Sequence, residues 1–166
     1  MRIFLGLCSN LGDREMNLVQ AKDLLMKHNV LVVGQSEVRE TKPLGGLDQP
    51  DYLNQVVECM SELSVEDLLK ACKQVEAEMG RPPKAVNLGN VQFGAPAPVL
   101  EQRWGSRIMD IDILFYGDLV MNTPQLTLPH YGVAERIFEL QGMCDLAADF
   151  VHPVLKKPMK ALLEEA

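Results

Sequence analysis

Asp110 and Asp112 are the residues whose type and spacing point most directly to chemistry. They lie in a run, M-D-I-D-I-L, whose alternation of polar and apolar residues predicts a β-strand. Side chains two residues apart on a strand project from the same face, so the two carboxylates are expected side by side. The apolar residues expected on the opposite face, toward the core, are Ile111, Ile113 and Phe115.

Two adjacent carboxylates are costly to bury without cations. Their hard oxygen atoms suit Mg²⁺, which uses one or two carboxylates and completes its shell with water and phosphate oxygens. Arg103 and Arg107 lie just upstream. Arginine suits the remaining phosphate charge because it forms forked hydrogen bonds. The pattern predicts a metal and polyphosphate site on a strand. The alternative from the residues alone is a strand with a solvated polar face.

The elements that must position these carboxylates follow from periodicity. Strands are expected at residues 2–7, 30–40, 56–60 and 107–116, with a weaker one near 126–128. A helix is expected over about 13–28, after a structural turn at residues 9–13, and another between Ser64, whose capping box includes Asp67, and Gly80. The order βαββαβ predicts an α+β fold with helices on one face of an antiparallel sheet.

Composition limits the classes of function. The 166 residues are expected to form one domain, 1–166, with a real core. A net charge of −7 argues against a nucleic-acid or membrane binder, but a local arginine cluster still permits nucleotide binding. No signal peptide or membrane span is predicted. Four cysteines without a C-x-x-C pair and three scattered histidines predict no zinc site and a cytoplasmic protein with reduced thiols.

Several segments along the chain form a recognisable series. The segment at 103–114 reads R-W-G-S-R-I-M-D-I-D-I-L. The others are C-S-N-L-G-D-R at 8–14, E-T-K-P-L-G at 40–45, D-Q-P-D-Y-L-N at 48–54, Glu76 with Gly80-Arg81, L-P-H at 128–130, R-I-F at 136–138 and His152-Pro153. In order and in most spacings, this series resembles the motifs of the 6-hydroxymethyl-7,8-dihydropterin pyrophosphokinase family, which acts in folate biosynthesis.

The resemblance implies a ferredoxin-like fold with extra C-terminal elements. It also implies transfer of the β,γ-pyrophosphoryl unit of ATP to the hydroxymethyl group of 6-hydroxymethyl-7,8-dihydropterin, with release of AMP. Two Mg²⁺ ions are expected on Asp110 and Asp112, while Arg81 and Arg107 would grip the transferred group; these four are the expected catalytic residues. A monomer is expected, with a dimer possible.

Family position also assigns the substrate contacts. The expected ATP-binding residues are Lys73, Glu76, Trp104, Arg107, Ile113, His130, Tyr131 and Arg136. The expected pterin-binding residues are Thr41, Pro43, Leu44, Gly45, Tyr52, Asn54, Trp104 and Phe138. Tyr52 and Phe138 would stack on the ring, and Asn54 would hydrogen-bond to its edge. Taken singly, the two aromatics also fit core packing, His130 a structural histidine, and Lys73 with Glu76 a surface ion pair.

The sequence departs from the family pattern at three places. Cys8 replaces a glycine, and Pro83 occupies a position often held by arginine, although Lys84 retains a charge. Residues 85–102 form an insertion, so that an extended lid loop is expected at 82–102. Pro83 and the insertion favour a second hypothesis, a non-enzymatic descendant that binds nucleotide or pterin as a regulator. A third hypothesis is a ferredoxin-like interaction or metal-binding domain whose motif matches arise by chance.

Overall fold

The computed structural model describes residues 1–43, 49–80 and 108–166. Its centre is a five-stranded sheet in the order β2-β4-β1-β5, with β3 also paired to β4, and every pairing is antiparallel. The strands are β1 (Ile3–Ser9), β2 (Leu31–Gln35), β3 (Arg39–Thr41), β4 (Tyr52–Met60) and β5 (Asp110–Tyr116). This arrangement confirms the predicted ferredoxin-like α+β fold.

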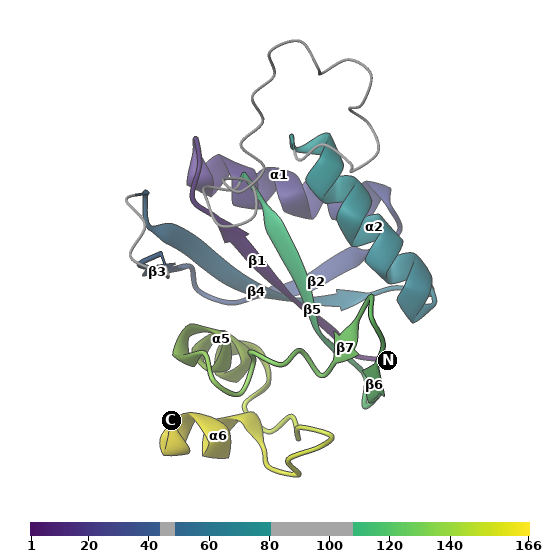
Figure 1. Ribbon diagram of the computed structural model, residues 1–166, viewed down its shortest axis with the longest axis vertical. Helices are drawn as coiled ribbons and strands as arrows, with labels where there is room; N and C mark the ends of the chain where they lie inside the picture. The colour runs from purple at the N-terminus through teal and green to yellow at the C-terminus, as the bar shows by residue number, and fades with distance from the viewer. Residues whose placement is uncertain (44–48, 81–107) are drawn as a thin grey trace.

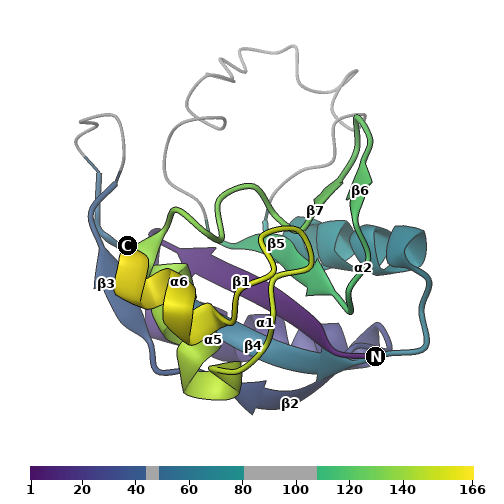
Figure 2. The same ribbon diagram turned by 90° about the horizontal axis from the view of Figure 1, so that it is seen from below.

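Helices cover both faces of the sheet (Figure 1). On one face lie α1 (Arg14–Lys27) and α2 (Val65–Glu78); on the other lie α5 (Ile137–Ala147) and α6 (Met159–Glu165). A small hairpin of β6 (Met121–Asn122) and β7 (Thr127–Leu128) follows β5. The two helices of the predicted βαββαβ unit therefore lie on one face, as expected, and the extra C-terminal helices cover the second face (Figure 2).

The sheet separates two hydrophobic cores. Ile3, Leu5 and Leu7 of β1 pack on the α1 and α2 side, whereas Phe4 packs on the α5 and α6 side. Since β1 is buried on both faces, its sequence is a nearly continuous apolar run rather than an alternating one. No helix within the described residues is long and apolar enough to cross a membrane.

The predicted helix starts are confirmed in their capping detail. Asp13 accepts a hydrogen bond from the backbone N of Met16 at 3.1 Å, and Ser64 accepts one from the backbone N of Asp67 at 3.1 Å. Gly12 has a φ of 76°, a conformation that glycine adopts readily, which explains the tight turn between β1 and α1. Residues 9–13 therefore form a structural turn, as predicted.

Two β-bulges interrupt the regular two-residue alternation of side chains between the faces of the sheet. The long strand predicted at 30–40 is divided into β2 and β3, and the register of β2 with β4 shifts between Val32 and Gly34. In β5 the register with β1 skips Leu114, so that Leu114 and Phe115 both pack on the α5 side. The prediction that Phe115 shares a face with Ile111 and Ile113 is thus wrong.

Candidate active site

Asp110 and Asp112 project from the face of the sheet that carries α5. Their neighbours Ile111 and Ile113 belong to the opposite core, so alternation along β5 places both carboxylates together, as predicted. The register then relates them to the rest of the sheet. Asp110 lies opposite Cys8 of β1, and Cys8 lies opposite Asn54 of β4. With about 4.8 Å between strands, the predicted metal ligand and the predicted pterin-binding amide are about 10 Å apart on one face.

Glu76 of α2 holds the carboxylate strand in place. Its Oε2 accepts a hydrogen bond at 2.7 Å from the backbone N of Ile111, the residue between the two aspartates. Glu76 is 4% exposed, which does not fit the plain surface ion pair that was the alternative for Glu76 with Lys73. Because β5 is an edge strand and backbone groups alternate along it, the backbone of Ile113 also faces this edge.

Replacing Glu76 by Leu would leave the Ile111 N–H buried without this acceptor. We expect Glu76→Leu to lower the free energy of unfolding by about 1–3 kcal/mol and to loosen the strand that carries both aspartates. Urea unfolding measures the first effect, and hydrogen exchange of the Ile111 amide measures the second. Unchanged protection of that amide would contradict the assigned role. The exposed Glu66→Leu, in the first turn of the same helix, is the control.

A histidine and an arginine face Asp112. His130 Nε2 lies 3.6 Å from Asp112 Oδ2, and Arg136 Nη1 lies 3.9 Å from the same oxygen. The backbone N of Gly132 donates to His130 Nδ1 at 3.1 Å, so the hydrogen of the neutral ring is on Nε2, toward the carboxylate. Burial raises the pKa of Asp112, and burial lowers the pKa of His130 although the nearby carboxylate opposes that shift. Both shifts favour the neutral forms of the pair.

Tyr131 and Gly132 shape the space around Arg136. The Arg136 guanidinium carbon lies 5.8 Å from the centre of the exposed Tyr131 ring, which stacks on His130. A Cβ built on Gly132 would lie 2.7 Å from Arg136 Nε, closer than such atoms normally approach. The glycine therefore lets the guanidinium reach back toward Asp112.

Glu139, in the first turn of α5, is a site residue that the sequence analysis missed. Its Oε2 lies 3.6 Å from Arg136 Nη1, and its Oε1 has no hydrogen-bond partner among the described residues. Burial raises the pKa of Glu139 to about 7, although Arg136 opposes the shift. A single acidic residue within the apolar run I-F-E-L at 137–140 was the available signal.

Three of the predicted pterin-binding residues, Thr41, Tyr52 and Asn54, lie together on β3 and β4. Asn54 donates through Nδ2 to Thr41 Oγ1 at 2.8 Å and to the carbonyl of Arg39 at 3.0 Å. Its Oδ1 accepts from Cys8 Sγ at 2.9 Å. Since both amide hydrogens are used, the group that remains for a ligand is the second lone pair of Oδ1. Tyr52 pairs with Thr41 in the β3–β4 register.

The remaining predicted site residues are distributed as follows. Phe138 on α5 and Pro43 after β3 are partly buried, and Lys73 on α2 is exposed. Arg81, Trp104, Arg107, Leu44, Gly45 and the expected lid loop at 82–102 lie outside the described residues. Their assignments stay predictions.

The turn after β1 ties the separate parts of the site together. Asn10 Nδ2 donates to Gln49 Oε1 at 2.9 Å and to the carbonyl of Pro50 at 3.0 Å, just before β4. Arg14 donates to the carbonyl of Asp51 at 2.8 Å, and Asn17 reaches the carbonyl of Ile108, just before β5. The turn after β1 and the first turn of α1 therefore fix the approach both to the strand that carries Asn54 and to the strand that carries Asp110 and Asp112.

The chemistry of the donor atoms fits Mg²⁺ held together with phosphate. Asp110 and Asp112 offer two carboxylates on one face, and the described residues contain no group of three or more metal-ligating side chains. Two carboxylates are what Mg²⁺ uses when phosphate oxygens and water supply the other positions. The four cysteines are free, and burial raises the pKa of Cys59 to about 12.

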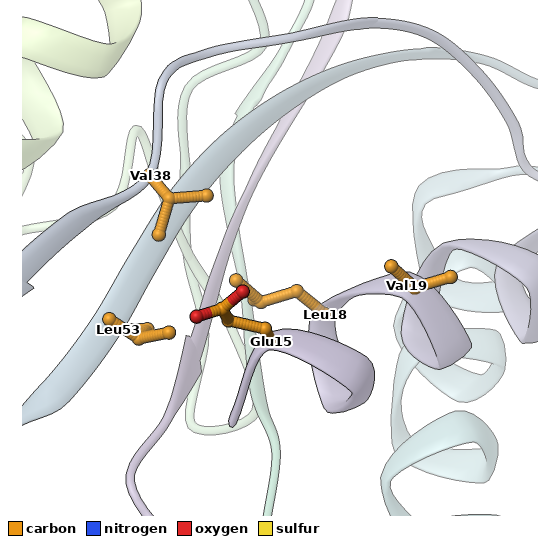
Figure 3. A pocket seen from close by; sticks show the side chains of 5 residues that line it. All are labelled: Glu15, Leu18, Val19, Val38 and Leu53. Atoms are coloured by element: carbon orange, nitrogen blue, oxygen red, sulfur yellow. The ribbon is translucent and has the colours of Figure 1, made fainter. Parts of the chain in front are cut away.

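An apolar pocket of about 420 Å³ lies on the opposite side of the sheet (Figure 3). The pocket is lined by Glu15, Leu18, Val19, Val38 and Leu53. These residues come from α1, from the segment between β2 and β3, and from β4. Leu53 belongs to the core on the α1 side, whereas Asn54 beside it in sequence faces α5. The sheet therefore separates this pocket from the carboxylates of Asp110 and Asp112.

Comparison with known proteins identifies relatives of this chain. A family model described as 7,8-dihydro-6-hydroxymethylpterin-pyrophosphokinase (HPPK) matches residues 4–148. The 2-amino-4-hydroxy-6-hydroxymethyldihydropteridine pyrophosphokinase of Methylorubrum extorquens is 36% identical over 151 residues, covering 90% of this chain and 85% of that protein. The folic acid synthesis protein fol1 of Schizosaccharomyces pombe is 32% identical over 98% of this chain, which spans 20% of fol1.

The structural comparison supports the fold. The Plasmodium falciparum HPPK-DHPS structure with pteroate matches with a TM-score of 0.71 and 14% identity, covering 99% of this chain and 42% of that one. Fold and site together define a ferredoxin-like protein with a paired-carboxylate strand suited to polyphosphate chemistry. The chain belongs to the 7,8-dihydro-6-hydroxymethylpterin-pyrophosphokinase family.

Proposed function

We propose that this protein transfers the pyrophosphoryl group of ATP to 6-hydroxymethyl-7,8-dihydropterin in folate biosynthesis, giving the pterin diphosphate and AMP. The observation that carries the proposal is the row formed by Asn54, Cys8 and Asp110 across three adjacent strands. In this row Asn54, which we expect to bind the pterin, lies about 10 Å from Asp110, which we expect to bind the metal. That spacing suits an alcohol held in line with a bound triphosphate.

The part of the site around Asp110 and Asp112, where the nucleotide would bind, acts by neutralising the charge of the phosphates. In phosphoryl transfer most of the catalysis comes from positioning and electrostatic stabilisation. When bound to Asp110 and Asp112, Mg²⁺ would neutralise phosphate charge and polarise the reacting phosphorus. His130 and Arg136, which face Asp112 here, then have phosphate oxygens as alternative partners. Arg81 and Arg107 complete this cationic set in the proposal.

Two further features support binding of ATP at this end. Burial raises the pKa of Asp112, and the positive charge of Lys73 opposes that shift, so Lys73 acts on the same region. Ile113 is an expected ATP-binding residue on the edge strand β5, and its backbone would bond to the hydrogen-bonding edge of adenine. Glu76 acts at this end through Ile111, whose backbone it holds.

The pterin end combines an amide with aromatic residues. Asn54 Oδ1 would accept a hydrogen bond from a ring N–H, because its amide hydrogens are already donated to Thr41 and Arg39. Tyr52 and Phe138 would stack on the ring, with Pro43, Leu44 and Gly45 alongside and Trp104 closing the site. The expected assembly stays a monomer, and Mg²⁺ is the expected cofactor.

Release of AMP tests the proposal directly. We expect Mg·ATP to yield AMP only when 6-hydroxymethyl-7,8-dihydropterin is present, and chelation of the metal by EDTA to stop the reaction. Separation of nucleotides by anion-exchange chromatography measures this. Binding of ATP without any AMP would instead support the hypothesis of a non-enzymatic descendant, which Pro83 and the 85–102 insertion favour.

A further inference from the structure

Arg136 is placed between two carboxylates that come from different elements. Its Nη1 lies 3.9 Å from Asp112 Oδ2 on β5 and 3.6 Å from Glu139 Oε2 on α5. Asp112 is the predicted metal ligand, whereas the function proposed above gives Glu139 no role. Arg136 Nη1 therefore lies near both Asp112, which has a role in the proposed reaction, and Glu139, which has none.

The placement of Glu139 is costly for a residue that only packs. Its side chain is 4% exposed, against 30% for Arg136, and Glu139 Oε1 has no hydrogen-bond partner among the described residues. The helix around it is apolar, with Leu140 and Met143 fully buried, so packing alone requires no carboxylate. A buried charge with incomplete pairing lowers stability.

Glu139 also points toward the reacting face of the sheet. A Cβ built on Gly6 would lie 3.3 Å from Glu139 Oε2, so this carboxylate lies directly over β1. Gly6 is the register partner of Asp112. The absence of a side chain at Gly6 thus makes room for a carboxylate beside the strand that carries the aspartates.

We propose that Glu139 is a positioning residue that keeps Arg136 directed at the phosphates of the bound nucleotide; the proposal rests on the function proposed above. When the metal and nucleotide engage Asp112, Arg136 loses one of its two anionic partners. Glu139 remains as the second partner. A long arginine side chain that stays anchored loses less conformational freedom on binding phosphate, so the nucleotide binds more tightly.

A double-mutant cycle tests this role through binding. We expect Glu139→Gln to weaken binding of Mg²⁺ with α,β-methylene-ATP roughly tenfold, the loss typical of one charged hydrogen bond. The KM for ATP should rise in parallel, while the KM for the pterin stays unchanged. In an Arg136→Met background the same substitution should have no further effect, because Glu139 acts through Arg136. Isothermal titration calorimetry measures the Kd of all four proteins.

The control is Glu135→Gln, which removes the same charge from an exposed position one residue before Arg136. Its Kd should equal that of the wild type. If Glu139→Gln does not fold, as judged by circular dichroism, Glu139→Leu carries the same test on this apolar helix. An unchanged Kd in the Glu139 variant, or effects that multiply independently in the double variant, would overturn the proposal.

The same experiment separates this proposal from the proposed function. If the wild type releases AMP with pterin but the cycle shows no coupling, only the role of Glu139 fails. If the cycle shows coupling in analogue binding but no AMP forms, the pyrophosphokinase function fails while the positioning of Arg136 stands.

Discussion

Asp112→Asn is expected to lower the turnover number for pterin-dependent AMP formation by on the order of 10³-fold. The substitution keeps the size of the side chain but removes one of the two carboxylate charges that β5 presents. It also leaves His130 and Arg136 without their shared anionic partner. Initial rates of AMP formation at saturating ATP and pterin, measured across a series of Mg²⁺ concentrations, give the effect.

The matched control is Asp118→Asn, which makes the same change at an exposed position in the turn after β5. It should retain the wild-type turnover number and the wild-type dependence on Mg²⁺. A turnover number for Asp112→Asn within threefold of the wild type would sink the assignment of this carboxylate to the metal site. Both variants should keep the wild-type circular dichroism spectrum, since neither residue belongs to a hydrophobic core.

The stability of the ligand-free protein is expected to fall as the pH rises through the range in which Glu139 titrates. Its pKa is about 7 in the folded protein, against 4.5 for the ordinary carboxyl group. Between these values the folded state holds a proton that the unfolded state has released, so the free energy of unfolding decreases with rising pH. The pKa shift corresponds to a loss of about 3 kcal/mol in the free energy of unfolding as the pH rises through this range.

Urea unfolding between pH 5 and pH 8.5 measures this loss by comparing the wild type with Glu139→Gln. The wild type should lose about 3 kcal/mol relative to the variant over this range, since the amide does not titrate. Glu135→Gln should follow the pH dependence of the wild type. Parallel curves for the wild type and Glu139→Gln would show that the buried carboxyl has an ordinary pKa in solution.

Together with the binding test, this result would show that Glu139 lowers the stability of the ligand-free protein and tightens the binding of the nucleotide. The carboxyl that destabilises the ligand-free fold at neutral pH is the one that we propose anchors Arg136. Buried charges of this kind are typical of functional sites, where local stability is lower than packing alone would allow.

Local sequence signals were sufficient for most of the secondary structure and for part of the site. The capping residues Asp13 and Ser64 begin their helices as predicted, because a cap depends on residues three positions apart. The pairing of Asp110 and Asp112 on one face followed from the two-residue period of a strand. The family motifs also led to the correct fold and family, which the comparisons confirm.

The features that were missed depend on neighbours far away in the sequence. Phe115 changes face because β5 bulges at Leu114 against β1, and that register is set by a strand about a hundred residues earlier. The register shift between Val32 and Gly34 likewise reflects the pairing of β2 with β4. A bulge is a mismatch between two strands, so a period read along one strand does not contain it.

The sequence by itself determined the starts of α1 and α2, the two adjacent carboxylates and the family. These are properties of residues close together in the chain or of motifs in a fixed order. Only the tertiary structure decided that Glu76 holds Ile111, that Cys8 lies between Asn54 and Asp110, and that Glu139 meets Arg136 above Gly6. The physical reason is that sheet register and helix docking, not sequence distance, set which buried polar groups become partners.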